Sequence, residues 1–103
     1  MKRLISAICV LFFLLPLSAQ ETYQKETFIS SRGDTLQYRL LQPENMKKSE
    51  KYPLVLFLHG AGERGNDNER QLTHGGQMFL NPVNREKYPA FVLAPQCPVT
   101  GYL

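Results

Sequence analysis

The residues with the strongest chemical signal form a glycine-rich stretch, His59-Gly60-Ala61-Gly62, directly after five consecutive apolar residues at 54–58. Glycine adopts backbone angles that are closed to other residues, so the chain can turn sharply here and point N–H groups outward. Because glycine has no side chain, another molecule can also approach closely. Pre-aimed N–H donors stabilise the oxyanion that forms when a nucleophile attacks an ester carbonyl. The stretch therefore suits a set of N–H donors for an oxyanion.

Two histidines and two charged residues lie close to this turn in the sequence. His59 is a candidate general base by residue type, and His74 is expected to be a solvated loop residue, with substrate contact as the alternative. Glu63 and Arg64 are candidate substrate-binding residues; the alternative is an ion pair that holds the loop. No metal site is predicted, because neither histidine has a cysteine or carboxylate cluster beside it. No cofactor is expected.

Two other kinds of site fit this region less well. Residues 60–65 match the G-x-G-x-x-G string of dinucleotide-binding proteins, but a polar Asn-Asp-Asn sequence follows instead of an apolar helix face. Asp67 and Glu69 could be the paired carboxylates of a glycosidase. Nothing in the sequence sets the separation of these two carboxylates, which favours a solvated loop.

The elements that position the turn follow from the apolar pattern. Residues 54–58 and 90–94 are short apolar runs bounded by proline or glycine, which is typical of strands covered on both faces. About thirty residues separate them, the size of a crossover unit, so the two strands should be parallel neighbours. Short helices are expected around 69–72 and 77–80.

Two antiparallel strands at the edge of the sheet are predicted before these, at residues 23–30 and 35–41, joined by a glycine-containing turn. Leu36, Tyr38 and Leu40 share one face of the second strand, because side chains alternate along a strand. That face is expected to be the buried one.

The N-terminus has the layout of a secretory signal peptide: a basic start at 1–3, an apolar run at 4–17 and the small residue Ala19 at the expected cleavage site. The run is shorter than the roughly 20 residues of a membrane-spanning helix, so no stable membrane anchor is expected. The sequence therefore predicts an exported protein, periplasmic or extracellular.

Charge and cysteine content exclude some partners. Removal of residues 1–19 lowers the formal net charge from +3 to +1, with ten basic and nine acidic residues left. No basic patch interleaved with aromatics is present, so no nucleic-acid partner is expected. Cys97 is then the one remaining cysteine, interpreted as a buried thiol or as a residue whose partner lies beyond Leu103.

Residues 58–65, Leu-His-Gly-Ala-Gly-Glu-Arg-Gly, and residues 91–98, Phe-Val-Leu-Ala-Pro-Gln-Cys-Pro, together resemble the phospholipase/carboxylesterase and dienelactone-hydrolase-like branch of the α/β-hydrolases. They are also similar to feruloyl-esterase-like and prolyl-oligopeptidase-like hydrolases. The resemblance covers residues 52–103 and, more loosely, the two strands before them. It implies an α/β fold in which residues 20–103 form the N-terminal part of a hydrolase domain: two antiparallel edge strands plus one parallel crossover, incomplete.

In that family the residue after His-Gly donates one oxyanion N–H, which maps onto Ala61, and the second donor follows the nucleophile. The resemblance also implies that His59 is structural rather than a general base and supports the turn by hydrogen bonding. The nucleophile lies in a G-x-S-x-G elbow on a later strand, followed by Asp and His. Ser30, Ser31 and Ser49 are the serines after residue 19, and none has the flanking glycines. The chain is therefore interpreted as a fragment without a nucleophile, in which the strand at 54–58 exposes an apolar edge.

The resemblance implies that the parent protein is an exported serine hydrolase of carboxylic esters, with a small-molecule or polysaccharide-linked ester as its substrate. Two alternatives stay open. One is a serine peptidase of the prolyl-oligopeptidase type. The other is a non-catalytic exported binding module in which the turn at His59 and Gly60 is only a tight bend. The sequence gives no oligomeric state.

Overall fold

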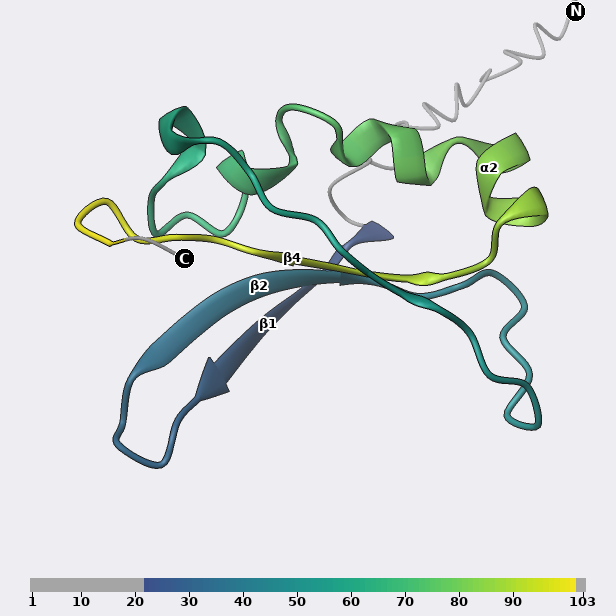
Figure 1. The fold of residues 1–103 in the computed structure, drawn as a ribbon, viewed down its shortest axis with the longest axis horizontal. Coiled ribbons are helices and arrows are strands. Elements are labelled where there is room, and N and C mark those ends of the chain that lie inside the picture. The colour runs from purple at the N-terminus through teal and green to yellow at the C-terminus, as the bar shows by residue number, and fades with distance from the viewer. Residues whose placement is uncertain (1–21, 102–103) are drawn as a thin grey trace, which may run out of the picture.

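The computed structural model describes residues 22–101, so the predicted signal peptide lies outside the described residues. Within them, four strands form one sheet in the order β1-β2-β4-β3 (Figure 1). The strands are β1 (Gln24–Ile29), β2 (Thr35–Leu41), β3 (Leu54–Leu56) and β4 (Phe91–Pro95). Between β3 and β4 lie η1 (Ala61–Glu63), η2 (Arg70–Leu72), η3 (Gly76–Leu80) and α2 (Pro82–Lys87).

The antiparallel β1–β2 hairpin confirms the first pair of predicted strands. Its turn uses Gly33 at φ 86°, a left-handed conformation that suits glycine. The Gly33 N–H donates to the Ser30 carbonyl over 2.9 Å, and the Ser30 N–H donates to the Asp34 carbonyl over 2.8 Å. β1 is the outer strand, whereas β2 also pairs antiparallel with β4.

β3 and β4 are parallel neighbours, as predicted, with Val55 opposite Val92. β3 is shorter than the predicted strand at 54–58, although the Phe57 N–H still donates to the Leu93 carbonyl over 2.9 Å. The expectation that this strand is covered on both faces is wrong for the described residues, because all helical segments lie on one side of the sheet (Figure 1). Leu54, Leu56 and Leu58 alternate onto the uncovered face and are 63%, 57% and 56% exposed. β3 is also the outermost strand, which is the exposed apolar edge that the fragment interpretation implies.

All of the helical segments lie on one side of the sheet (Figure 1). The core on that side is built from one aromatic and four aliphatic side chains: Tyr23, Leu41, Leu72, Val92 and Ala94. The Tyr23 hydroxyl donates to the Gly76 carbonyl over 2.8 Å. Burial raises the pKa of Tyr23 to about 12, and the positive charge of Arg85 opposes this only in part.

The covered side of β2 is not the one that the sequence predicts. Leu36, Tyr38 and Leu40 are only half-buried, whereas Arg39 and Leu41 are 3% and 2% exposed. Arg39 and Leu41 are opposite Ala94 and Val92 of β4, on the face that the helical segments cover. The prediction was wrong because the alternation of β2 offers an apolar residue on both faces, and only the crossover decides which face is covered.

The predicted helices around 69–72 and 77–80 are present as the 3-10 segments η2 and η3. The sequence interpretation missed α2. Asn81 caps this helix, because its side-chain oxygen accepts from the N–H groups of Val83 and Asn84, and Pro82 occupies the first helical position. An Asn-Pro pair is a recognisable helix start. None of the helices in residues 22–101 has the length and hydropathy of a membrane-spanning segment.

We predict that purified residues 20–103 are poorly soluble or unstable, because an apolar outer strand invites pairing between chains. Lysine at both Leu54 and Leu56 should raise the soluble monomer fraction in sedimentation and size-exclusion measurements. The matched control is Val55→Lys, which places a charge against the core and should lower that fraction. A cooperative thermal transition of the unaltered chain would contradict the prediction.

Candidate active site

The glycine-rich turn lies at the carboxyl end of β3 and begins η1. Gly60 precedes the helix in an extended conformation, φ −82° and ψ 174°, and no side chain caps the helix. Among residues 22–101, the N–H groups of Ala61 and Gly62 donate to no other residue. Both residues are exposed. These are the first N–H groups of a helix, which have no partner within the helix itself, so they are available to an outside acceptor.

His59 connects this turn to the chain that follows β4. Its Nε2 accepts a hydrogen bond of 2.9 Å from the Cys97 N–H. The ring proton is therefore on Nδ1, which lies 2.6 Å from the Gly60 carbonyl oxygen and donates to it. Both ring nitrogens are engaged, which leaves neither of them to take a proton from a nucleophile. Cys97 itself is buried and forms no disulfide within the described residues.

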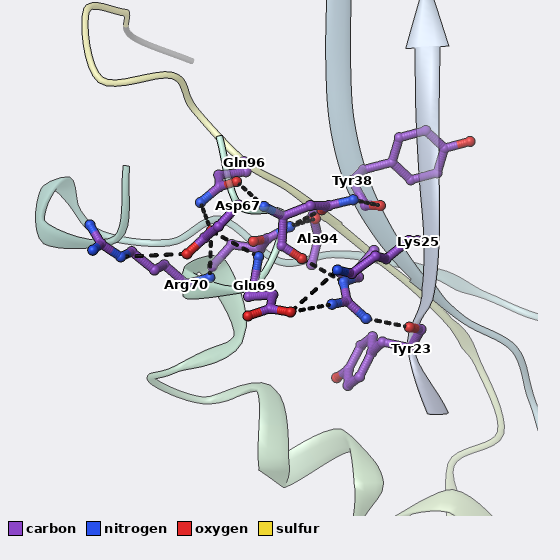
Figure 2. Close-up of polar contacts among 11 residues, drawn as sticks. Tyr23, Lys25, Tyr38, Asp67, Glu69, Arg70, Ala94 and Gln96 are labelled. Atoms are coloured by element: carbon purple, nitrogen blue, oxygen red, sulfur yellow. Dashed lines mark hydrogen bonds and ion pairs between the residues drawn. The ribbon is translucent and has the colours of Figure 1, made fainter. Parts of the chain in front are cut away.

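Gln96, the residue before Cys97, is 2% exposed. It holds the end of η1 and the loop that follows η1 at three points. Its side-chain Nε2 donates to the Glu63 carbonyl over 3.3 Å and to Asp67 Oδ1 over 2.8 Å. Its Oε1 accepts from the Asn68 N–H over 2.7 Å. Figure 2 shows Gln96 directly above Asp67 in this network. The sequence interpretation missed Gln96 as part of the site, although it lies within the Ala-Pro-Gln-Cys stretch that carried the resemblance.

Asn68 is the centre of the polar network and adopts φ 53°, in the left-handed region. Its carbonyl accepts from Arg39 Nε. Its side-chain Nδ2 donates to the Tyr38 carbonyl over 3.1 Å, and its Oδ1 accepts from Gln71 Nε2 over 2.6 Å. Its backbone N–H donates to Gln96, so every polar group of Asn68 is paired within the protein.

Asp67 organises the start of η2. Its Oδ1 accepts from the N–H groups of Glu69 and Arg70 over 3.0 and 3.2 Å, and its Oδ2 lies 3.5 Å from Arg70 Nε. Desolvation by partial burial raises the pKa of Asp67. The hydrogen bonds from Gln96 and from the two N–H groups, together with the Arg70 charge, outweigh it and lower the pKa below its ordinary 3.8.

Glu69 points to the other side of this loop, toward the sheet. Its Oε1 lies 3.3 Å from Lys25 Nζ and 3.8 Å from Arg39 Nη2 (Figure 2). The prediction of a solvated loop for Asp67 and Glu69 agrees with their side-chain exposures of 43% and 46%, although both carboxylates also hold the loop in place. Their separate partners also do not form the facing pair of a glycosidase.

Arg39 is a buried charge on the covered face of the sheet. Its Nη1 donates to the Tyr23 carbonyl over 2.8 Å, in addition to its bond to Asn68 and its contact with Glu69. Burial lowers the pKa of Arg39 below its ordinary value, against the charges of Glu69 and Asp67. The guanidinium therefore links β2 to the start of β1 and to the crossover.

Glu63 and Arg64 follow the turn. The Glu63 carboxylate is 17% exposed and lies 3.3 Å from Nε2 of His74, whose side chain is 78% exposed. The backbone N–H of Arg64 closes η1 on the Ala61 carbonyl over 3.4 Å. The structure thus gives Glu63 a loop-holding contact with His74, and the substrate-binding role of Glu63 and Arg64 stays a prediction. Within the described residues, no three His, Cys, Asp or Glu side chains gather as a metal site would need.

An apolar cavity of ≈ 590 Å³ lies at the opposite end of the parallel strands. It is bounded by residues that precede β3 and β4 and by the end of β2, among them Pro53, Ala90 and Leu41. Ligands of open α/β sheets bind at the carboxyl ends of the strands. The candidate site is therefore the turn at Ala61 and not this cavity.

Comparison with known proteins adds one decisive match. No family model and no curated protein matches the chain. Among solved structures, a crystal structure of a thermostable esterase aligns with 79% of this chain at 42% sequence identity and a TM-score of 0.73. The chain has the fold of part of an α/β-hydrolase-type esterase. The match covers 22% of that esterase, so the chain spans about a fifth of its length.

Removal of the Arg39 guanidinium should destabilise this esterase fold. Arg39→Met leaves buried carbonyls at Tyr23 and Asn68 without their donor, which costs about 2–4 kcal/mol. Lys25→Met is the matched control, since it removes an exposed ion pair to the same carboxylate and should cost less than about 1 kcal/mol. Urea unfolding of the full-length protein, the product of the reading frame that contains this chain, measures both. Equal costs would contradict the buried role of Arg39.

Asp67 should make the fold sensitive to acid. A carboxylate whose pKa is lowered by folding stabilises the folded state above its unfolded pKa, and this contribution is lost as pH falls through the folded pKa. The midpoint temperature of thermal unfolding of the full-length protein should therefore decrease as the pH is lowered below 3.8. In the Asp67→Asn variant, the same decrease in pH should lower the midpoint temperature by less. Identical pH profiles of the two proteins would show that Asp67 contributes nothing to acid sensitivity.

Proposed function

We propose that this chain supplies the first oxyanion donor of an exported serine hydrolase that acts on carboxylic esters, with Ala61 as the donor residue. The observation that carries the proposal is the pair of exposed N–H groups at Ala61 and Gly62, which have no acceptor in the described chain. They follow β3 directly, at the carboxyl end of the parallel strands, where substrates bind in this kind of sheet.

The chemistry fits an ester carbonyl. Attack by a nucleophile moves negative charge onto the carbonyl oxygen, and fixed N–H donors stabilise that charge without having to reorganise during the reaction. The proposed role of His59 is to fix the direction of these donors, because its ring bridges the Gly60 carbonyl and the Cys97 N–H. Gly60 and Gly62 let the substrate approach the backbone closely.

The rest of the catalytic machinery is proposed to lie in a longer protein. The thermostable esterase is several times longer than the matched region, and a serine elbow, an acid and a base are expected there. Export rests on the sequence of residues 1–19. The proposed substrate class is a small-molecule or polysaccharide-linked ester, bound without a cofactor.

The sharpest test is Ala61→Pro in the full-length protein, assayed with a short-chain chromogenic ester. Proline has no N–H, yet its fixed φ suits the first position of a helix, and Gly60 is already extended as a residue before proline should be. The fold should therefore persist, which far-UV circular dichroism checks. Loss of one oxyanion donor should lower kcat by about 10²–10³-fold, with little change in KM.

Ala61→Gly is the matched control, because it keeps the N–H and should retain most of the activity. Equal activity of the proline and glycine variants would contradict the assignment of Ala61. The purified chain 20–103 should hydrolyse no ester, since it carries no serine elbow. A stop codon directly after Leu103 would contradict a longer serine hydrolase and would favour a binding module.

A further inference from the structure

Two consecutive residues after β4 hold the whole glycine-rich turn. The Cys97 N–H donates to His59 at the start of the turn, and the Cys97 carbonyl accepts from the Gly65 N–H over 3.0 Å. Between these points, the side chain of Gln96 donates to the Glu63 carbonyl. The same side chain also donates to Asp67, which follows Gly65. The turn is therefore attached to the end of β4 at several points, in addition to the hydrogen bonds within the turn itself.

The Gln96 side-chain amide makes three of its four possible hydrogen bonds within the protein. Its nitrogen has two acceptors, its oxygen has one donor, and the side chain is buried. Its backbone N–H donates to the Gln37 carbonyl of β2 over 2.9 Å, which fixes the residue to the sheet. A Cβ added at Gly65 would lie 3.2 Å from Gln96 Nε2, so the turn packs closely on the amide.

The bond to the Glu63 carbonyl is the one that reaches the candidate site. Glu63 is the last residue of η1, and Ala61 is the first. In this single turn of 3-10 helix, a shift of the Glu63 peptide also changes the direction of the Ala61 N–H. Oxyanion donors work because they are held in place before the reaction, and a misplacement of about 1 Å can cost about 10²-fold in rate.

We infer that Gln96 is a positioning residue for the oxyanion turn, acting through its side-chain bonds to the Glu63 carbonyl and to Asp67. The inference rests on the proposed function for its catalytic consequence, but its structural consequence is independent of activity. Without the amide, η1 is attached to the chain after β4 only through the flanking bonds at His59 and Gly65, while the sheet stays paired. The Ala61 and Gly62 N–H groups then sample many directions.

Gln96→Leu in the full-length protein tests this directly by ¹⁵N relaxation. The order parameters of Ala61 and Gly62 should fall from about 0.85 to below about 0.6, while those of β2 and β4 stay unchanged. The kcat for a short-chain ester should fall by about 10–100-fold with little change in KM. Gln37→Leu is the matched control, because the Gln37 side-chain oxygen has no partner in the described chain; it should change neither quantity.

A nearly isosteric substitution gives a second test that survives poor folding of the leucine variant. Gln96→Glu keeps the volume and an oxygen that can accept from the Asn68 N–H. It replaces the donor nitrogen with an acceptor that faces the Glu63 carbonyl and Asp67, so the order parameters of Ala61 and Gly62 should fall as in Gln96→Leu. A merely space-filling role for Gln96 predicts no change, because glutamate and glutamine have nearly the same volume.

The outcomes separate the two proposals. If the wild-type protein hydrolyses no ester, the proposed function fails, and the order parameters still decide the role of Gln96. If Gln96→Leu leaves Ala61 and Gly62 as ordered as Gln37→Leu does, the inference about Gln96 is overturned whatever the activity. Unchanged order at Ala61 and Gly62 in Gln96→Glu would overturn it equally. Loss of order at these two residues in both Gln96 variants supports it.

Discussion

The crossover between β3 and β4 depends on complete pairing of a buried Asn68. This residue is 5% exposed and left-handed in its backbone, and it bonds to β2 through Tyr38 and Arg39 and to β4 through Gln96. A polar, irregular segment can lie against a sheet only if its backbone groups find partners there. Asparagine suits the position, because it tolerates a positive φ better than most residues and brings both a donor and an acceptor.

Much of the fold was predictable from local sequence. The apolar runs at 54–58 and 90–94 predicted a parallel pair, and the glycine-containing turn between residues 30 and 35 predicted the hairpin. The candidate turn itself could be located because its glycines follow a strand directly. These features depend on neighbouring residues, so a single sequence contains them.

What the sequence could not predict depends on contacts between distant residues. The covered face of β2 is set by Arg39, which bonds to Asn68, 29 residues further along the chain. The pairing of Asp67 with Gln96 spans 29 residues as well. A run such as Asn-Asp-Asn looks like a solvated loop when its partners are unknown. The Asn-Pro start of α2 is different, since its capping signal is local and was available.

The close packing of Gly65 on Gln96 also determines where the chain can change in length. From His59 to Asn68 the backbone is attached to β4 at several points, so one added residue would pull at least one of these bonds out of register. The loop at 44–51, by contrast, is exposed along its whole length. Inserted sequence, such as an affinity tag or a reporter peptide, is best accommodated there. The fold thus separates a segment of fixed length that forms the candidate site from a connection at the other end of β3 whose length is free to vary (Figure 1).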